Sequence, residues 1–204
     1  RLPMSRRSPM RRIDLNEAAN FLRENDRFLI LMHGSPDGDT VGCGTALCGA
    51  LQQIGKLAKL ACPDPIPKKF GYMFREIKEQ DFEPETIIAV DVADTKLLYG
   101  MKEIGEKTQL CIDHHVSNTE YAERLLLAPE YAAAAELMFE LLSSMKEVKI
   151  TNSIADSLYT GIATDSGCFK YSNTSPQTHV YAAELMTLGA DIVPINYAMF
   201  DMKS

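Results

Sequence analysis

Histidine and aspartate residues recur at three points where a short apolar run of the sequence ends. His33, Asp91 and Asp113 each directly follow such a run. The three runs cover residues 28–32, 86–90 and 109–112. Runs this short and this uniformly apolar are typical of buried strands. Because open α/β sheets bind their ligands outside the carboxyl ends of the strands, we expect these polar residues to meet at one edge of one sheet.

Additional acids and imidazoles accompany the three strand ends. They are, in chain order, Asp37, Asp39, His114, His115 and Asp165, the last at the end of a predicted helix. Carboxylates gathered in this way repel one another, and burying them unpaired is prohibitive. Divalent metals remove the repulsion, and carboxylate and imidazole ligands suit Mn²⁺, Mg²⁺, Zn²⁺ or Fe²⁺. The ligand count is enough for two ions sharing one carboxylate, an arrangement that activates a water for phosphoryl displacement.

Each acid also has an ordinary structural explanation when it is taken alone. A single Asp after a strand is usually a turn residue or a helix cap, and this description fits Asp39, Asp91 and Asp165. The run 113–115 is harder to explain, because three polar residues follow one apolar strand. The remaining histidine, His179, lies in a Thr-rich helical context without an acidic neighbour, and we interpret it as structural or surface-exposed. The joint pattern favours a metal centre.

The elements that must position these residues alternate between strand and helix in the first half of the chain. Apolar spacing predicts helices over 15–25 and 39–54 and a further strand over 57–62. This alternation implies an α/β fold with a mostly parallel sheet flanked by helices. The second half is helix-rich. Its predicted helices cover 132–145, 152–163 and 176–188, a short amphipathic stretch follows over 192–200, and no strong strand separates them.

The composition limits the remaining alternatives. The 204 residues, 46% of them hydrophobic, can form one domain with a real core. No run approaches the roughly 18 apolar residues of a membrane span, so we expect no membrane partner. The formal charge of −7 argues against broad electrostatic binding to long nucleic acids. The five cysteines are scattered without a C-x-x-C pair, which favours reduced thiols and a cytoplasmic location over disulfides or structural zinc.

The first twelve residues differ from the rest in charge. Residues 1–12 contain five arginines and no acid. We interpret them as a basic arm or an artificial extension that precedes the domain. Residues 13–204 are then expected to form a single domain.

The motifs resemble those of the DHH phosphoesterase superfamily. Its four motifs are matched, in order, by residues 33–39 (HGSPDGD), 91–94 (DVAD), 113–115 (DHH) and 161–167 (GIATDSG). The resemblance extends over roughly residues 14 to 200. Within the superfamily, the segments 113–118 and 169–178 are most similar to the RecJ-like branch of bacterial oligoribonucleases and phosphoadenosine-phosphate phosphatases. Members of this branch carry a second, C-terminal, glycine-rich substrate-binding domain, which we expect to be absent from this chain.

The resemblance implies a ligand set for two divalent ions, with Mn²⁺ expected and Mg²⁺ or Co²⁺ as alternatives. One ion would be held by His33, Asp37 and Asp91. The other would be held by Asp39, Asp91, His114 and Asp165, so that Asp91 bridges the two.

Three further residues receive roles from the resemblance. His115 would face the substrate phosphate and help to protonate or stabilise the leaving oxygen. Asp113 would orient the histidine pair, and Asn118 would touch the phosphate or brace the loop. The implied activity is hydrolysis of very short RNA, linear dinucleotides or 3′-phosphoadenosine 5′-phosphate. A homodimer is one alternative for its assembly, and the sequence leaves the oligomeric state open.

Three other functions remain open on the sequence. An inorganic pyrophosphatase or exopolyphosphatase resembles the same four motifs. A non-catalytic nucleotide-binding module would show eroded ligand positions, and none is eroded here. An interaction domain built on the helical second half would leave the acids at the strand ends unexplained.

Overall fold

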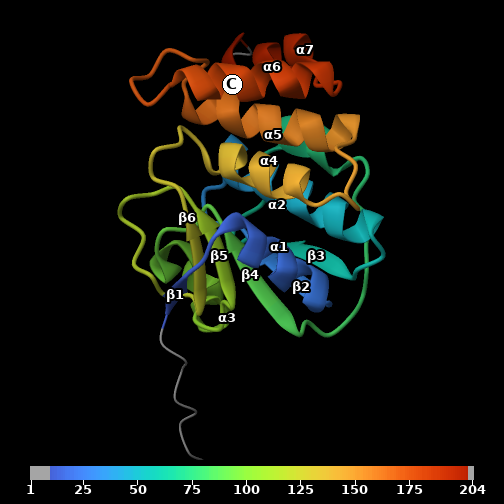
Figure 1. Cartoon of the computed structure of the whole chain (residues 1–204), viewed down its shortest axis with the longest axis vertical. Helices are drawn as coiled ribbons and strands as arrows, with labels where there is room; N and C mark the ends of the chain where they lie inside the picture. Colours follow the sequence, from blue (N-terminus) through green and yellow to red (C-terminus); the bar gives the residue numbers. More distant parts are fainter. Residues whose placement is uncertain (1–9, 202–204) are drawn as a thin grey trace, which may run out of the picture.

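The protein consists of a parallel sheet with helices packed in layers on it (Figure 1). The computed structural model describes residues 10–201. Its six strands are β1 (Arg11–Arg12), β2 (Phe28–Leu31), β3 (Ala58–Ala61), β4 (Thr86–Val90), β5 (Leu110–Asp113) and β6 (Arg124–Leu127). The order across the sheet is β1-β6-β5-β4-β2-β3, and every pair is parallel. The predicted α/β fold is therefore confirmed.

The strands are apolar on both faces because each face covers a core of its own. Ile30 and Ile88 belong to the larger core, beneath the main helices, whereas the neighbouring Leu31 and Ala89 belong to a smaller core on the opposite face. Leu98, from the 3-10 helix η2 (Thr95–Met101), completes that smaller core. A sheet buried on both faces explains why the strands read as continuous apolar runs rather than alternating ones.

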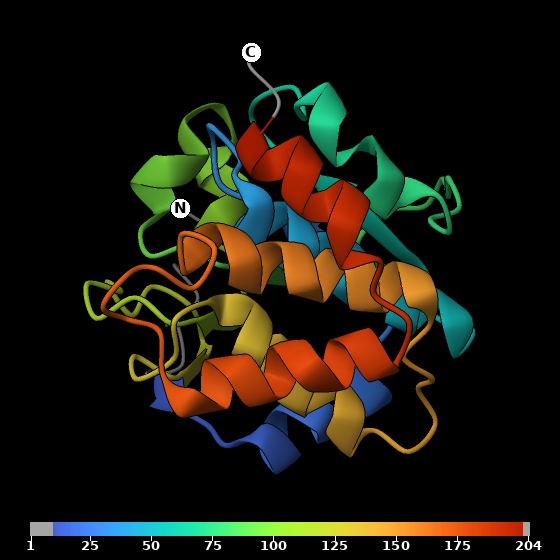
Figure 2. The ribbon, with the colours of Figure 1, turned by 90° about the horizontal axis from the view of Figure 1, so that it is seen from above.

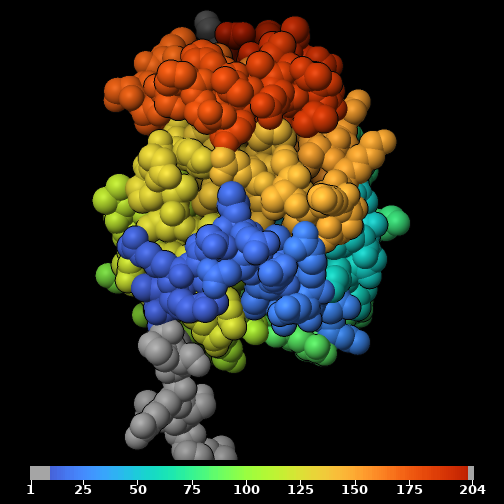
Figure 3. Space-filling view, in the orientation of Figure 1, coloured from blue at the N-terminus to red at the C-terminus, as the bar shows by residue number. Residues whose placement is uncertain are grey.

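The helices form successive layers above one face of the sheet. They are α1 (Leu15–Glu24), α2 (Gly38–Gln53), α4 (Ala134–Ser144), α5 (Asn152–Asp165), α6 (Pro176–Thr187) and α7 (Ile192–Asn196), with a π-helical turn after the last (Tyr197–Asp201). In Figure 2, α5 lies between α6 and the segment of α7. The space-filling view in Figure 3 shows the same segments, in orange and red, covering the end of the molecule farthest from the sheet.

Shorter elements lie between the strands. The 3-10 helix η1 (Lys68–Phe74) follows β3, and α3 (Lys102–Gly105) leads towards β5. Helix α2 begins directly after the loop that follows β2, and it packs closely against α5. A Cβ atom on Gly42 of α2 would lie 2.3 Å from the main-chain oxygen of Ser157 in α5, so only glycine permits this approach. This contact brings the end of α5 to the carboxyl edge of the sheet.

Two strands differ from the sequence-based expectation. Strand β6 was not predicted, because its three leucines make too short an apolar run to stand out from the surrounding loop. Arg11 and Arg12, which we expected to belong to the arm, form the edge strand β1 beside β6. Both side chains are exposed, and the strand is defined by main-chain pairing, with the Arg11 amide donating to the Glu123 carbonyl at 3.0 Å. The expectation for residues 1–9 lies outside the described residues, and the domain extent 13–204 stays a prediction.

The other predicted elements are present, with no end shifted by more than two residues. The helical second half is confirmed in α4, α5 and α6. Within residues 10–201, no helix combines the length and the apolar character needed to cross a bilayer.

Candidate metal centre

The loop after β2 delivers two carboxylates and an imidazole to the carboxyl edge of the sheet. His33 follows the strand, and Asp37 is the N-cap of α2, accepting from the amides of Asp39 and Thr40 at 3.1 Å each. Because Asp37 starts the helix, Asp39 falls in its first turn, where its side chain is fully buried. The cap that starts the helix therefore also sets the positions of both acids.

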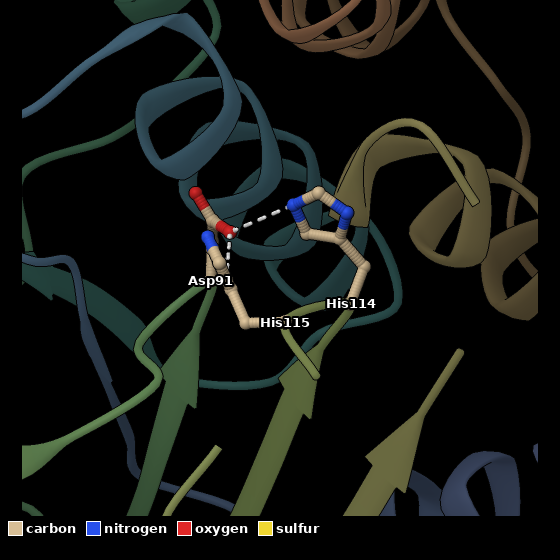
Figure 4. A group of neighbouring side chains, drawn as sticks. All are labelled: Asp91, His114 and His115. Atoms are coloured by element: carbon tan, nitrogen blue, oxygen red, sulfur yellow. Dashed lines mark ion pairs between the residues drawn. The ribbon is translucent and has the colours of Figure 1, made fainter. Parts of the chain in front are cut away.

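Asp91 and the pair His114–His115 come from the two neighbouring strands. Asp91 directly follows β4 and has a φ of 58°, a left-handed conformation that Asp tolerates better than most residues. Its amide donates to the Ile112 carbonyl of β5 at 2.9 Å, so the two strand ends are tied together. Figure 4 shows β4 and β5 rising towards Asp91 and His114, with the Asp91 carboxylate between the two imidazoles.

The two oxygens of Asp91 face two different groups of ligands. Its Oδ2 lies 3.6 Å from Nε2 of His33, which is also 3.6 Å from Oδ1 of Asp37. Its Oδ1 lies 3.7 Å from Nε2 of His114. A single carboxylate therefore belongs to both groups, in the position that a bridging ligand would take.

The second group gathers side chains from α2, α5 and the end of β5. Nε2 of His114 lies 3.7 Å from Oδ2 of Asp39 and 3.3 Å from Oδ2 of Asp165. The approach of α5 depends on Gly161, since a Cβ atom there would lie 2.7 Å from both Oδ1 of Asp39 and the Cβ of Ala135. The structure thus brings together the three side chains, which are far apart in the sequence.

Main-chain carbonyls orient both of the imidazoles that face inward. Nδ1 of His33 donates to the Gly34 carbonyl at 2.8 Å, and Nδ1 of His114 donates to the Tyr131 carbonyl at 3.0 Å. In each ring Nδ1 is occupied by this hydrogen bond, and Nε2 is therefore the nitrogen that points at the carboxylates. This arrangement of the outer hydrogen bond is usual for histidines that bind metals.

His115 lies at the mouth of the site rather than inside it. Its side chain is 41% exposed, and its Nδ1 lies 2.8 Å from Oδ1 of Asp113 and 3.4 Å from Oδ1 of Asp91. Asp113 is buried, and its other oxygen accepts from the side-chain amide of Asn118 at 2.7 Å. Asn118 therefore braces Asp113 in this structure. Away from the centre, His179 is exposed and stacks on Phe169.

The buried atoms at the centre of the site fit a bound cation. Among the described residues, Oδ1 of Asp91 and Nε2 of His114 are buried and have no hydrogen-bond partner. Three groups of ligand atoms lie close enough to hold an ion: Asp91, His114 and His115; His33, Asp37 and Asp91; and Asp39, His114 and Asp165. Carboxylate oxygens and imidazole nitrogens are suited to Mn²⁺ and related divalent ions. The two unpartnered atoms are explained if an ion lies between them.

The pKa values show how strongly these groups are coupled without an ion. Burial opposes the charge on His33, but the carboxylates of Asp37 and Asp91 outweigh it and raise its pKa to about 11. Burial likewise opposes the charge on His114, and Asp165, Asp39 and Asp91 together raise its pKa to about 10. Without an ion, the positive charge of the protonated imidazoles balances the carboxylate charge that a bound cation would neutralise.

The pKa values of the buried carboxylates are shifted as well. Burial, followed by repulsion from Asp91 and Asp165, raises the pKa of Asp39 well above its ordinary value. Burial is also the main reason that the pKa of Asp91 rises to about 6. An isolated cluster of this kind is unfavourable, and divalent cations would relieve it.

Comparison with known proteins assigns the chain to a family. The model of the DHH family, N-terminal domain, matches residues 27–162. The chain belongs to this family. It is similar to the bifunctional oligoribonuclease and PAP phosphatase NrnA of Thermus thermophilus, with 31% identity over 81% of this chain and 51% of that protein. The NrnA protein of Bacillus subtilis is 26% identical over 79% of this chain and 53% of its own length.

The chain spans about half the length of these curated relatives. Among solved structures, an exopolyphosphatase-related protein from Bacteroides fragilis superposes with a TM-score of 0.82 at 23% identity. That match covers 93% of this chain and 61% of the other. The likeness confirms the fold. The family match accounts for the motif order that the sequence analysis described.

Proposed function

We propose that the chain carries the metal centre of a phosphoesterase that hydrolyses short oligoribonucleotides or 3′-phosphoadenosine 5′-phosphate. Linear dinucleotides fall within the same substrate class. The observation that carries the proposal is the position of Asp91, whose two oxygens face two separate groups of His and Asp ligands. The similarity to NrnA proteins, named for oligoribonuclease and PAP phosphatase activity, supports the choice of substrate.

The geometry supports the ligand roles that the family resemblance implies. His33, Asp37 and Asp91 would hold one ion, and Mn²⁺ is the first choice, ahead of Mg²⁺ and Co²⁺. The second ion would be held by Asp39, Asp91, His114 and Asp165. Bound divalent ions supply an activated water and neutralise charge on the phosphate.

His115 is suited to handle the proton of the leaving group. Its Nδ1 is paired with buried Asp113, which raises the pKa of His115 and leaves Nε2 as its free nitrogen. Because the ring is partly exposed at the mouth of the site, Nε2 can reach a phosphoester placed there. Asn118 acts through Asp113, by holding the carboxylate that orients this imidazole. A proton donor held in this way assists departure of the leaving oxygen.

A substrate comparison tests the proposal. The purified chain is incubated with Mn²⁺ and, in separate reactions, a diribonucleotide, 3′-phosphoadenosine 5′-phosphate and pyrophosphate. We expect release of mononucleotide or phosphate from the first two. Asp91→Ala should abolish that release, whereas Glu103→Ala, which replaces an exposed acid outside all four motifs, should leave it unchanged.

Two results would contradict the proposal. Hydrolysis that is equally fast in Asp91→Ala would remove the metal centre from the reaction. Faster cleavage of pyrophosphate than of either nucleotide would assign the chain to a different substrate class. A chain that binds Mn²⁺ and a nucleotide without cleaving it would instead be a binding module.

A further inference from the structure

The segment Tyr131–Glu136, at the start of α4, touches the metal centre without contributing a ligand. Four of its six residues are alanines, whose side chains have no polar atoms. None of the four sequence motifs includes it. Nevertheless, its main-chain groups reach the side chains of Asp39 and His114, two members of the second ligand group, which Asp165 completes.

Asp39 is held by the first two amides of α4. The Ala134 amide donates to its Oδ2 at 2.7 Å, and the Ala135 amide donates to its Oδ1 at 2.9 Å. All three residues are fully buried. Amides at the start of a helix favour a negative charge, so these bonds fix both oxygens of a carboxylate that burial would otherwise disfavour. The orientation of Asp39 therefore depends on where α4 begins.

The other two members of the group are tied to the same segment. The Tyr131 carbonyl accepts from Nδ1 of His114 at 3.0 Å and so sets the direction of its Nε2. The side-chain amide of Asn173 donates to the carbonyls of Ala132, at 3.3 Å, and Asp165, at 3.0 Å. Asn173 thus joins the end of α5 to the start of α4. Main-chain groups of residues 131–135 therefore orient the side chains of Asp39 and His114, and through Asn173 they are linked to the main chain of Asp165.

Glu136 holds this segment in place from inside the protein. Its side chain is fully buried, and its Oε2 accepts from the Ala132 amide at 2.6 Å. Its Oε1 is buried without a hydrogen-bond partner among the described residues. A buried acid with an unpartnered oxygen is destabilising by itself, so its presence calls for a compensating role. The N-cap residue of α4, Ala133, makes no side-chain cap, so Ala132 is held before the helix by Glu136 at its amide and by Asn173 at its carbonyl.

We propose that Glu136 is a positioning residue for the ion held by Asp39, His114 and Asp165. It anchors Ala132, and the main chain on either side of Ala132 then orients Asp39 and His114, while Asn173 links Ala132 to the main chain of Asp165. The inference rests on the proposed function only in requiring that this group binds an ion. Within residues 10–201, no hydrogen bond joins the segment 131–136 to the other ligand group, of which His33 is a member. The effect of Glu136 should therefore fall on one ion and spare the other.

The test compares Glu136→Ala with Glu136→Gln in a titration of the purified chain with Mn²⁺. Calorimetry gives the affinity for each ion, and electron paramagnetic resonance distinguishes a coupled pair of Mn²⁺ ions from a single one. Glu136→Ala removes the acceptor for the Ala132 amide. We expect it to weaken one ion by about 10- to 100-fold, the usual range for losing a partner behind a ligand, and to convert the paired signal into that of a single ion. Glu136→Gln keeps an acceptor oxygen and should stay within about threefold of the wild type.

The control lies one turn further along the same helix. Glu140 accepts from the hydroxyl of Tyr131 at 2.7 Å, so it holds the same segment by a side chain instead of the main chain. Glu140→Gln should bind both ions as the wild type does. If Glu136→Ala fails to fold, Asn173→Ala tests the same segment, because Asn173 is exposed and donates to the Ala132 carbonyl. This variant should weaken the same single ion.

The outcomes separate this inference from the proposed function. Unchanged binding of both ions by Glu136→Ala, or by Asn173→Ala if the first variant does not fold, would overturn the inference. Equal weakening of both ions would also overturn it, since that result describes a general loss of structure. A wild-type chain that binds two ions but hydrolyses no phosphoester would contradict the proposed function and leave the positioning role intact.

Discussion

Both ends of the parallel sheet carry many acids, but the acids at the two ends differ in burial and in the side chains around them. At the carboxyl end, Asp39, Asp91 and Asp113 are buried and interleaved with three histidines. At the amino end, an open groove of about 820 Å³ precedes β4, β5 and β6. Its acidic lining consists of Glu83, Glu85, Glu103, Glu106, Glu120 and Glu123, and no histidine lines it.

The difference shows that a metal centre is marked by burial and by mixed ligand types, rather than by the number of acids. Water solvates the four exposed glutamates of the groove, and the half-buried Glu120 and Glu123 are paired with Arg12 and Arg124, so these acids need no metal ion. The buried aspartates have no such solvent, and their mutual repulsion is relieved only by protons or metal ions. The formal charge of −7 combines both kinds of acid, and it therefore says little about the field at the site.

The largest contrast between the two ends is expected when one acid at each end is neutralised. Asp39→Asn replaces a fully buried carboxylate, and its new amide hydrogens would face the amides of α4. We expect Mn²⁺ affinity to fall by more than about 100-fold, beyond the usual loss for groups behind a ligand. Glu106→Gln at the exposed end should change it by less than about twofold. Calorimetric titration of both variants measures the contrast, and similar losses in the two would contradict it.

A change of pH should also alter metal binding at the carboxyl end. Raised pKa values of about 11 for His33 and about 10 for His114 mean that both imidazoles are protonated at pH 7 without metal. An ion requires the neutral ring, so binding must release about two protons, and affinity should rise with pH between about 6 and 10. The proton release is measured by titrating Mn²⁺ in buffers of different ionisation enthalpy. A heat of binding independent of the buffer would show that these protons are not displaced.

A smaller effect is expected from a change that touches only the main chain. Ala134 is the first residue of α4, a position where helices accept proline, and the extended conformation of Ala133 suits a residue before proline. Ala134→Pro removes the amide that donates to Asp39. We expect Mn²⁺ affinity to fall by about tenfold with the helix retained. Circular dichroism checks the helix, and an unchanged affinity with an intact helix would rule out a role for this amide.

The smallest effect is expected at the amino end. Replacing Glu83, Glu85 and Glu103 together by glutamine removes three exposed charges from the groove. We expect the free energy of unfolding to change by less than about 1 kcal/mol, because exposed charges contribute little to stability. Mn²⁺ affinity should remain that of the wild type. A larger loss of stability, or a loss of Mn²⁺ affinity, would mean that the groove contributes to folding or to metal binding.

The sequence predicted the parts of the site that depend on side chains. The residues after β2, β4 and β5 could be recognised because polar ligand types follow short apolar runs, and parallel strands bring their carboxyl ends together. The position of Asp165 was predicted at the end of a helix, where the structure places it. The close approach of that helix also has a sequence signal, since Gly42 and Gly161 lie at the points of contact.

The parts that were missed depend on main-chain contacts. β1 consists of two exposed arginines, and nothing in that dipeptide indicates a strand until β6 is in place beside it. The contacts of Tyr131, Ala134 and Ala135 with the ligands use amides and carbonyls, which every residue possesses. The available signal was Glu136, an acid that directly follows four alanines.

The alanine run at the start of α4 has a consequence for transplanting this centre onto another protein. A graft that copies the histidines and aspartates would reproduce the ligands but not the amides that hold Asp39 or the carbonyl that orients His114. A scan that replaces side chains by alanine would not reveal the omission, because the native residues at 132–135 are already alanine. The smallest portable unit is therefore the set of strand ends, the start of α2 and the end of α5, together with residues 131–135.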